Sequence, residues 1–187
     1  YFEDQKKIEV TENALLNIMF EDDTLFISAD KFVSFNNHQK EYLIAYENIN
    51  IFKSDIQGRC DSLYYNSSES VLNLYINPVL WINKIQITSD SINISINKKE
   101  IENINFRTNP IIISEADSIY FDQIKGVFMH AILQQNKLSQ LNVIGQSQSL
   151  FLIKDDKDNS NIGINKVTSD DITIYMKENE INNITYK

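Results

Sequence analysis

The chain has 187 residues and a mass of 21.7 kDa, which suits one domain with a sizeable core or one elongated stack. Hydrophobic residues make up 42% and charged residues 23%, and no apolar run approaches the roughly 18 residues of a membrane-spanning helix. The composition therefore argues against a disordered chain or a helical membrane protein, and a net charge of -9 argues against nucleic acid as a partner.

The N-terminal region is the least regular part of the chain. We expect residues 1–13 to form a lead-in segment and residues 12–20 to form a strand or a short turn, because β-branched and aromatic residues surround the one stretch that could be helical. No segment resembles a linker, so residues 1–187 are treated as a single domain.

Alternation of apolar and polar residues dominates the rest of the chain. Leu72, Leu74 and Ile76 alternate with polar residues, and the same pattern recurs in residues 91–96 and 171–176. Side chains alternate between the two faces of a strand, so each segment predicts a strand with one apolar face. The apolar positions switch from odd to even between residues 87 and 92, and a similar switch separates residues 143 and 150, which predicts a bulge or corner in both places.

The chain also repeats itself. Over the 18 positions that start at Ser89 and at Ser169, eight residues are identical. Shorter echoes place an aspartate, or once a glutamine, at intervals of 22 to 31 residues, at Asp30, Asp61, Asp90, Asp117, Gln148 and Asp170. Each interval fits two strands and two turns, and residues 97–100 and 177–180 have the composition of hairpin loops. A two-strand unit cannot bury its apolar face alone, so the units must stack.

These patterns predict an all-β fold in which repeated antiparallel hairpins form a twisted, open β-jellyroll. The inward positions predict an apolar stripe that is either an ordinary core or a ligand-binding groove. Its residues are Leu63, Tyr65, Leu72, Leu74, Ile92, Ile94, Ile119, Phe121, Leu150, Leu152, Ile172 and Ile174.

Polar candidates for catalysis or metal binding are weak. The repeated aspartates are interpreted as corner residues that satisfy backbone N–H groups. Residues 155–161 lack the glycine and glutamate that a calcium loop of the EF-hand type needs. His38 and His130 have no acidic or thiol neighbour at ligand spacing, and Cys60 stands where other units have alanine or serine. We therefore expect no catalytic residue, no metal site and no cofactor.

One stretch carries a family resemblance. Residues 60–66 read Cys-Asp-Ser-Leu-Tyr-Tyr-Asn, and an alternating strand and Asn77-Pro78-Val79-Leu80 follow. This order resembles the OstA-like family of lipopolysaccharide transport proteins, to which LptA belongs, and is nearest to the OstA-like proteins of Bacteroidetes. The similarity extends from about Ala14 to Tyr186, although asparagine often replaces the family's glycines, as at Asn77.

The resemblance implies a non-enzymatic periplasmic module that holds lipopolysaccharide acyl chains in its apolar stripe. It also implies edge-to-edge strand pairing with other transport proteins or with a second copy, in a bridge towards the outer membrane. Two other functions remain open from the residues alone. One is a structural or adhesive repeat with a solid core, and the other is a carbohydrate-active enzyme, for which no pair of carboxylates is apparent.

Overall fold

A computed structural model describes residues 6–19, 23–37, 40–82, 84–97, 100–135, 137–155, 157–158, 160–178 and 180–187. The described residues form fifteen antiparallel strands and no helix. The strands are β1 (Lys6–Met19), β2 (Thr24–Asn37), β3 (Lys40–Phe52), β4 (Ile56–Asn66), β5 (Val71–Tyr75), β6 (Val79–Ile82), β7 (Ile85–Thr88), β8 (Ser91–Asn97), β9 (Glu100–Arg107), β10 (Ile111–Glu115), β11 (Phe121–Lys125), β12 (Phe128–Gln134), β13 (Lys137–Lys154), β14 (Asn161–Lys177) and β15 (Glu180–Tyr186). The all-β prediction is confirmed.

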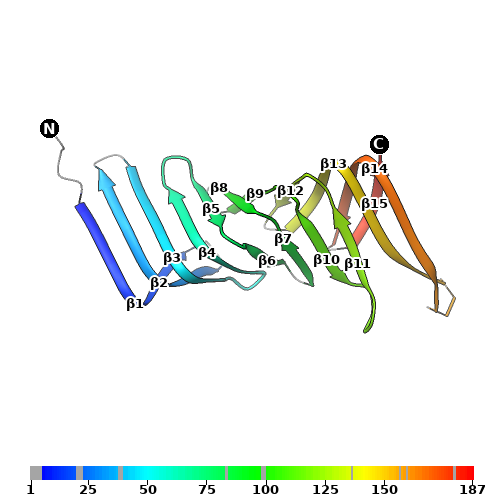
Figure 1. Cartoon of the computed structure of the whole chain (residues 1–187), viewed down its shortest axis with the longest axis horizontal. Helices are drawn as coiled ribbons and strands as arrows, with labels where there is room; N and C mark the ends of the chain where they lie inside the picture. The colour runs from blue at the N-terminus through cyan, green and yellow to red at the C-terminus, as the bar shows by residue number, and fades with distance from the viewer. Residues whose placement is uncertain are drawn as a thin grey trace.

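The architecture is a meander of bent strands. β1 to β4, β13 and β14 each bend near their middle, and β5 with β6, β7 with β8, β9 with β10, and β11 with β12 are the two arms of further bent strands. The arms form two layers. Layer 1 contains β5, β8, β9, β12 and β15, and layer 2 contains β6, β7, β10 and β11, while the long strands contribute one arm to each layer. Successive strands follow one another along the long axis, as Figure 1 shows.

The bends have a common backbone mechanism. In every second bent strand two adjacent residues have positive φ, and at this point the strand carries one residue more than the neighbours with which it pairs. These pairs are Glu12–Asn13, Glu47–Asn48, Ile76–Asn77, Thr108–Asn109 and Gly145–Gln146. Asparagine tolerates the left-handed region better than most residues, and Asn77 has a φ of 54°.

The strand between two such bulges turns its corner at a single residue. Asp30, Asp61, Asp90 and Asp170 occupy four of these corners, as the repeat predicted. The backbone N–H of Asp61 donates to the Ile76 carbonyl at 3.1 Å, and that of Asp170 donates to the Lys187 carbonyl at 2.9 Å. The Asp30 carboxylate instead accepts from the Asn48 side-chain amide at 2.7 Å. The corner contacts of Asp61 and Asp170 are thus made by their backbone N–H groups, which any residue other than proline could supply.

Two of the predicted corner positions are wrong. Asp117 lies in the turn between β10 and β11, where its carboxylate accepts from the backbone N–H groups of Ile119 and Tyr120 at 2.8 Å each. Gln148 lies beyond the corner of β13, which is at Gly145–Gln146. The corner between these two regions is at Gly126, where a Cβ would come within 2.6 Å of the Val143 side chain, so the close packing of the corner requires glycine.

The two kinds of corner differ in which side chains they turn inward. Across a single-residue corner the inward-pointing residues change between odd and even numbers. Ile87 and Ile92, on either side of such a corner, are both buried, so the predicted switch there is confirmed. A two-residue bulge keeps the parity unchanged. In β13, Val143, Ser147 and Ser149 are all buried, so the switch predicted between residues 143 and 150 is wrong.

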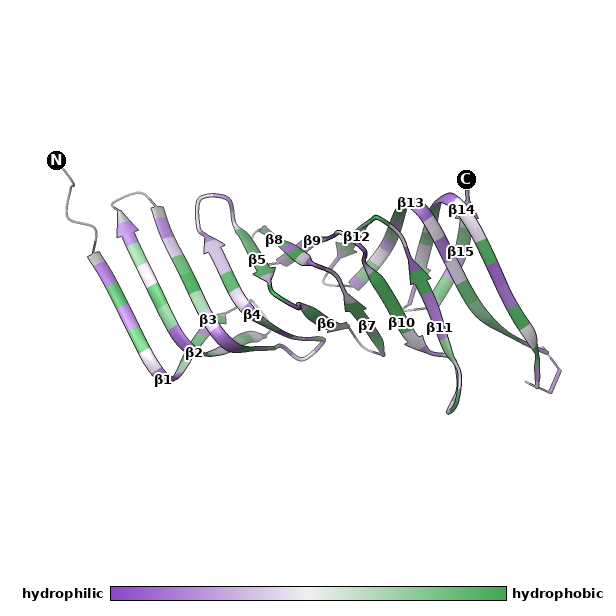
Figure 2. Ribbon diagram, in the orientation of Figure 1, coloured by the Kyte–Doolittle hydropathy of each residue, from purple (hydrophilic) through white to green (hydrophobic). Residues whose placement is uncertain are grey.

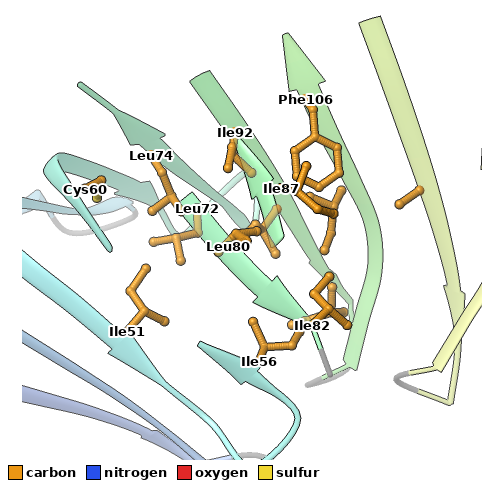
Figure 3. Close-up of a cluster of buried hydrophobic side chains, with 14 of the residues drawn as sticks. Ile51, Ile56, Cys60, Leu72, Leu74, Leu80, Ile82, Ile87, Ile92 and Phe106 are labelled. Atoms are coloured by element: carbon orange, nitrogen blue, oxygen red, sulfur yellow. The ribbon is translucent and has the colours of Figure 1, made fainter. Parts of the chain in front are cut away.

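The core is one continuous cluster between the layers, extending from Ala14 in β1 to Ile174 in β14. Figure 3 shows Leu72 and Ile92 of layer 1 facing Leu80 and Ile87 of layer 2. Within layer 2, Gly58 of β4 lies opposite Leu80 of β6, and a Cβ on Gly58 would come within 2.7 Å of the Leu80 side chain.

At the N-terminus, residues 6–11 form the first arm of β1 and pair with β2, where a lead-in was expected. The two predicted hairpins are formed, since Asn97 pairs with Glu100 and Lys177 with Glu180, although residues 98, 99 and 179 lie outside the described part. No helix that could span a membrane occurs among the described residues.

Candidate binding site between the two layers

The inner face of layer 1 carries two apolar rows that cross its strands in register. Strand pairing places each member directly opposite the next, which brings side chains on one face within contact distance. The first row is Val10, Phe32, Ala45, Leu63, Leu74, Ile92, Phe106, Met129, Val143, Ile172 and Tyr186. The second row is Leu43, Tyr65, Leu72, Ile94, Ile104, Ala131, Leu141, Ile174 and Ile184.

Layer 2 faces these rows with one of its own. The row is Leu16, Ile27, Ile51, Gly58, Leu80, Ile87, Ile112, Ile124, Ser149 and Val167. The interior between the layers is therefore lined with aliphatic and aromatic groups from β1 to β14. Ser147 and Ser149 are polar residues of this interior near the C-terminal end, where the Ser149 hydroxyl is 3.2 Å from the Tyr186 hydroxyl of the opposite layer.

Side chains fill most of this interior, but a cavity of about 50 Å³ remains in its C-terminal half. Its lining comes from both layers and is apolar except for Ser114. The lining residues are Ile82, Ile85, Ile87, Ile112, Ser114, Ile124, Ala131, Leu138, Leu141, Phe151, Ile174, Met176 and Ile181. Leu138, Phe151, Met176 and Ile181 are only partly buried or exposed, so the cavity lies near the side of the molecule away from the corners.

Seven of the twelve predicted site residues point into the interior and are at most 3% exposed. These are Leu63, Leu72, Leu74, Ile92, Ile94, Ile172 and Ile174. Tyr65 is partly buried and packs against the same cluster. Of the twelve, only Ile174 belongs to the cavity lining among the described residues.

The other four predicted residues do not share this face, which corrects the expectation of one continuous stripe. Ile119 is 74% exposed in the turn after Asp117, and Phe121 is 50% exposed. Leu150 and Leu152 lie on the outer side of layer 2, because the β13 bulge keeps Ser147 and Ser149 inside. The assumed change of parity therefore assigned Leu150 and Leu152 to the wrong face.

Most of the cavity lining was not predicted. Residues 111–113 are three consecutive isoleucines, and such a run does not reveal which member points inward. Phe151 was missed because its neighbours Leu150 and Leu152 were assigned to the inner face. Phe106 and Met129 belong to the first inner row and not to the cavity lining. Both are 0% exposed and follow the alternation of their strands, so they could have been found from it.

Charged groups occur at the N-terminal part of layer 2, in the turn between β3 and β4. Lys53 is 3% exposed, and its ammonium lies 2.6 Å from the Asp55 carboxylate and 3.4 Å from that of Asp23. Hydrogen bonds from the Ser54 hydroxyl, the Thr24 backbone and the Ser54 backbone lower the pKa of Asp23 to about 2, despite the opposing effect of burial. The network ties the start of β2 to the β3–β4 turn and is a structural contact at the rim.

The polar candidates from the sequence do not assemble into a reactive site. Burial raises the pKa of the Cys60 thiol to about 12, so the nucleophilic thiolate is disfavoured. The His130 ring lies 2.8 Å from the Asn105 side-chain oxygen, in a row of polar side chains on the outer face of layer 1. His38 and residues 156 and 159 of the candidate calcium loop lie outside the described residues, and the described residues contain no metal-binding cluster.

Comparison with known proteins identifies a structural relative. No family model matches the sequence, and no curated protein matches it either. Among solved structures, the chain resembles LptH, the LptA homologue and periplasmic component of the lipopolysaccharide transport device of Pseudomonas aeruginosa. The TM-score is 0.52 at 12% sequence identity, over 68% of this chain and 80% of LptH. The match shows that this chain has an LptA-like fold, as the sequence resemblance predicted.

Proposed function

We propose that this chain is a non-enzymatic periplasmic module that binds lipopolysaccharide through its acyl chains and passes it towards the outer membrane. The observation that supports the proposal is the continuous apolar interior between two layers, in a fold shared with a lipopolysaccharide transport component. Where they line the cavity, the inner rows of both layers supply hydrocarbon contacts, which is the chemistry an acyl chain requires.

The energetics favour acyl burial as the source of affinity. Each buried methylene contributes about 0.8 kcal/mol, so a twelve-carbon chain would contribute on the order of 10 kcal/mol before the entropic costs of binding. The cavity of about 50 Å³ has room for only a few water-sized groups. A whole chain therefore enters only if the layers part. The corners join them along one side, and we propose that they separate at the opposite side, near Met176 and Ile181.

The head group is expected to stay outside. The chain carries a net charge of -9, which does not attract anionic sugars and phosphates directly. Ser147 and Ser149 are buried polar residues of the interior, and they offer hydroxyl groups and no cation. The proposal therefore assigns binding to the acyl chains and leaves the saccharide in solvent.

Strand pairing at the two ends would connect this module to its partners. β1 pairs only with β2, and β15 only with β14, among the described strands. An unpaired edge presents backbone donors and acceptors to a further strand. A strand added to β1 would also extend the inner rows beyond Val10 and Leu16. We propose that other transport proteins or a second copy dock in this way.

A displacement assay tests the proposal. A fluorescent fatty acid is bound to the isolated chain and displaced with lipid A, with the delipidated saccharide as a control. We expect saturable binding that lipid A abolishes and the saccharide does not. Ile174→Asp should remove binding, whereas Tyr175→Asp, on the outer face of the same strand, should retain it. Circular dichroism is the control that tests whether both variants are folded.

A structural module with a solid core is the second candidate, favoured by the close packing of the N-terminal half, where Leu63, Leu74 and Ile92 are 0% exposed. It predicts no saturable signal from the fatty acid. It also predicts that lipid A leaves the melting temperature unchanged, whereas a ligand that binds only the native state raises it.

A further inference from the structure

The outer face of layer 2 carries an apolar surface in the C-terminal half of the chain. We call it the outer patch, and its members are Ile111, Ile113, Phe121, Leu150, Leu152 and Ile164. Ile111 and Ile113 are neighbours on the outer side of β10, Leu150 and Leu152 are neighbours on β13 with Leu152 opposite Ile164, and Gln123 of β11 lies between these two groups. Phe121 is 50% and Ile164 57% exposed. Figure 2 shows hydrophobic segments along β10 and β14 in this region.

The patch is basic, although the protein is acidic. Its outward-facing described neighbours on β10, β11, β13 and β14 include Lys125, Lys154 and Lys166 against Glu115, and in the adjoining β10–β11 turn the Asp117 carboxylate interacts with Lys154. The whole chain has a net charge of -9. Charges more than about 8 Å apart are largely screened at physiological salt, so an approaching surface experiences the local lysines more than the distant carboxylates.

A hollow of about 370 Å³ lies within this face, between two of the lysines. Lys125 and Lys166 border it from β11 and β14, Gln123 and Gln148 supply amides, and Ile111 and Leu150 supply apolar contacts. No carboxylate lines it among the described residues. The hollow thus offers ammonium and amide donors beside exposed hydrocarbon.

Isolated exposed apolar side chains are common on soluble proteins, but a contiguous apolar patch marks an interaction surface. Apolar side chains that penetrate the boundary between head groups and acyl chains, with lysines at the phosphate level, are the features of a membrane-surface site. Charge complementarity therefore selects an anionic occupant, and the exposed phenylalanine and isoleucines select one with a hydrocarbon layer.

We propose that the outer patch docks on the surface of an anionic phospholipid bilayer. Lys125 and Lys166 contact lipid phosphates, while Phe121, Leu152 and Ile164 enter the interfacial region. This site lies on the opposite side of layer 2 from the interior cavity, and it holds the module against a membrane independently of any lipid between the layers.

Vesicle sedimentation tests the proposal with the full chain. We expect binding to vesicles of equal parts phosphatidylglycerol and phosphatidylcholine, and little binding to phosphatidylcholine alone. At about 1 kcal/mol per lysine near an anionic surface, Lys125→Gln with Lys166→Gln should lower the partition coefficient roughly thirtyfold. The matched control is Lys137→Gln with Lys177→Gln, which makes the same charge change on layer 1 and should have little effect.

A second pair separates the apolar contribution from the charge. Phe121→Ser with Leu152→Ser keeps the net charge and should also reduce vesicle binding, while displacement of a fluorescent fatty acid from the interior stays unchanged. Equal losses in the layer 1 control and the patch variants would overturn the proposal, as would equal binding to both kinds of vesicle. Patch variants that alter only the sedimentation coefficient of the lipid-free protein would assign the surface to a second copy and refute membrane docking.

Discussion

Filling the cavity between the layers should separate ligand binding from stability. Ala131 is 1% exposed and lines the cavity from β12. Ala131→Leu adds three carbon atoms, which at about 0.8 kcal/mol each stabilise the fold by up to roughly 2.4 kcal/mol. Overpacking costs about 1 to 3 kcal/mol, so the two effects nearly cancel and the free energy of unfolding should change by about 1 kcal/mol or less.

Binding should change much more than stability. An acyl chain that enters the filled cavity loses contact area equivalent to about three methylenes, or roughly 2 kcal/mol, which is about a thirtyfold weaker dissociation constant. Fluorescent fatty-acid titration measures the affinity, and urea unfolding measures the stability.

The matched control is Ala45→Leu, in the tightly packed N-terminal half. Ala45 is 0% exposed and lies in register between Phe32 and Leu63. It is not part of the cavity lining, so this change should destabilise the protein by about 1 to 3 kcal/mol while leaving the affinity of the folded protein unchanged. Unaltered affinity in Ala131→Leu would refute the assignment of the cavity as the acyl site.

Three further predictions concern the fold. Gly126→Ala should destabilise the protein by about 1 to 3 kcal/mol in urea unfolding, because the new Cβ would lie 2.6 Å from the Val143 side chain. Gly163→Ala should be nearly neutral, because a Cβ there has nothing within 4 Å. Similar losses of stability in both variants would contradict the corner packing. Cys60 should resist thiol reagents in the native state. Because burial raises its pKa from 9.0 to about 12, the free energy of unfolding should decline as pH rises between these values. The Cys60→Ala variant should show a smaller decline. Asp23 has its pKa lowered from 3.8 to about 2, so its contribution to the stability of the fold is present above pH 3.8 and is lost as pH falls through 2. An unchanged acid-unfolding profile in Asp23→Asn would contradict this.

Sequence reasoning recovered the fold because alternation and repetition are both local signals. The strands around Leu72 and Leu74, Ile92 and Ile94, and Ile172 and Ile174 carry polar residues at every other position, so their inward faces were unambiguous. The aspartate repeat identified four of the corners. It failed at Asp117, where an aspartate serves a turn, and at Gly126, where close packing selects glycine instead.

The site was harder to predict because it depends on how strands bend. Across a two-residue bulge the inward-pointing residues stay odd or stay even, whereas across a one-residue corner they change. Sequence alone does not distinguish the two kinds of corner, because the bulge residues are as varied as Thr108 and Gln146. This ambiguity misplaced Leu150 and Leu152. The cavity arises from the separation of two layers whose contacts are distant in sequence, which no local pattern reports.

The most direct test of the account is a set of intermolecular NOEs between lipid A and isoleucine methyl groups in selectively labelled protein. If acyl chains bind between the layers, their methylene protons should show NOEs to Ile124 and Ile174, which line the cavity, and not to Ile164 on the outer face. NOEs confined to Ile164, or none to either cavity residue at saturating lipid, would contradict acyl binding between the layers.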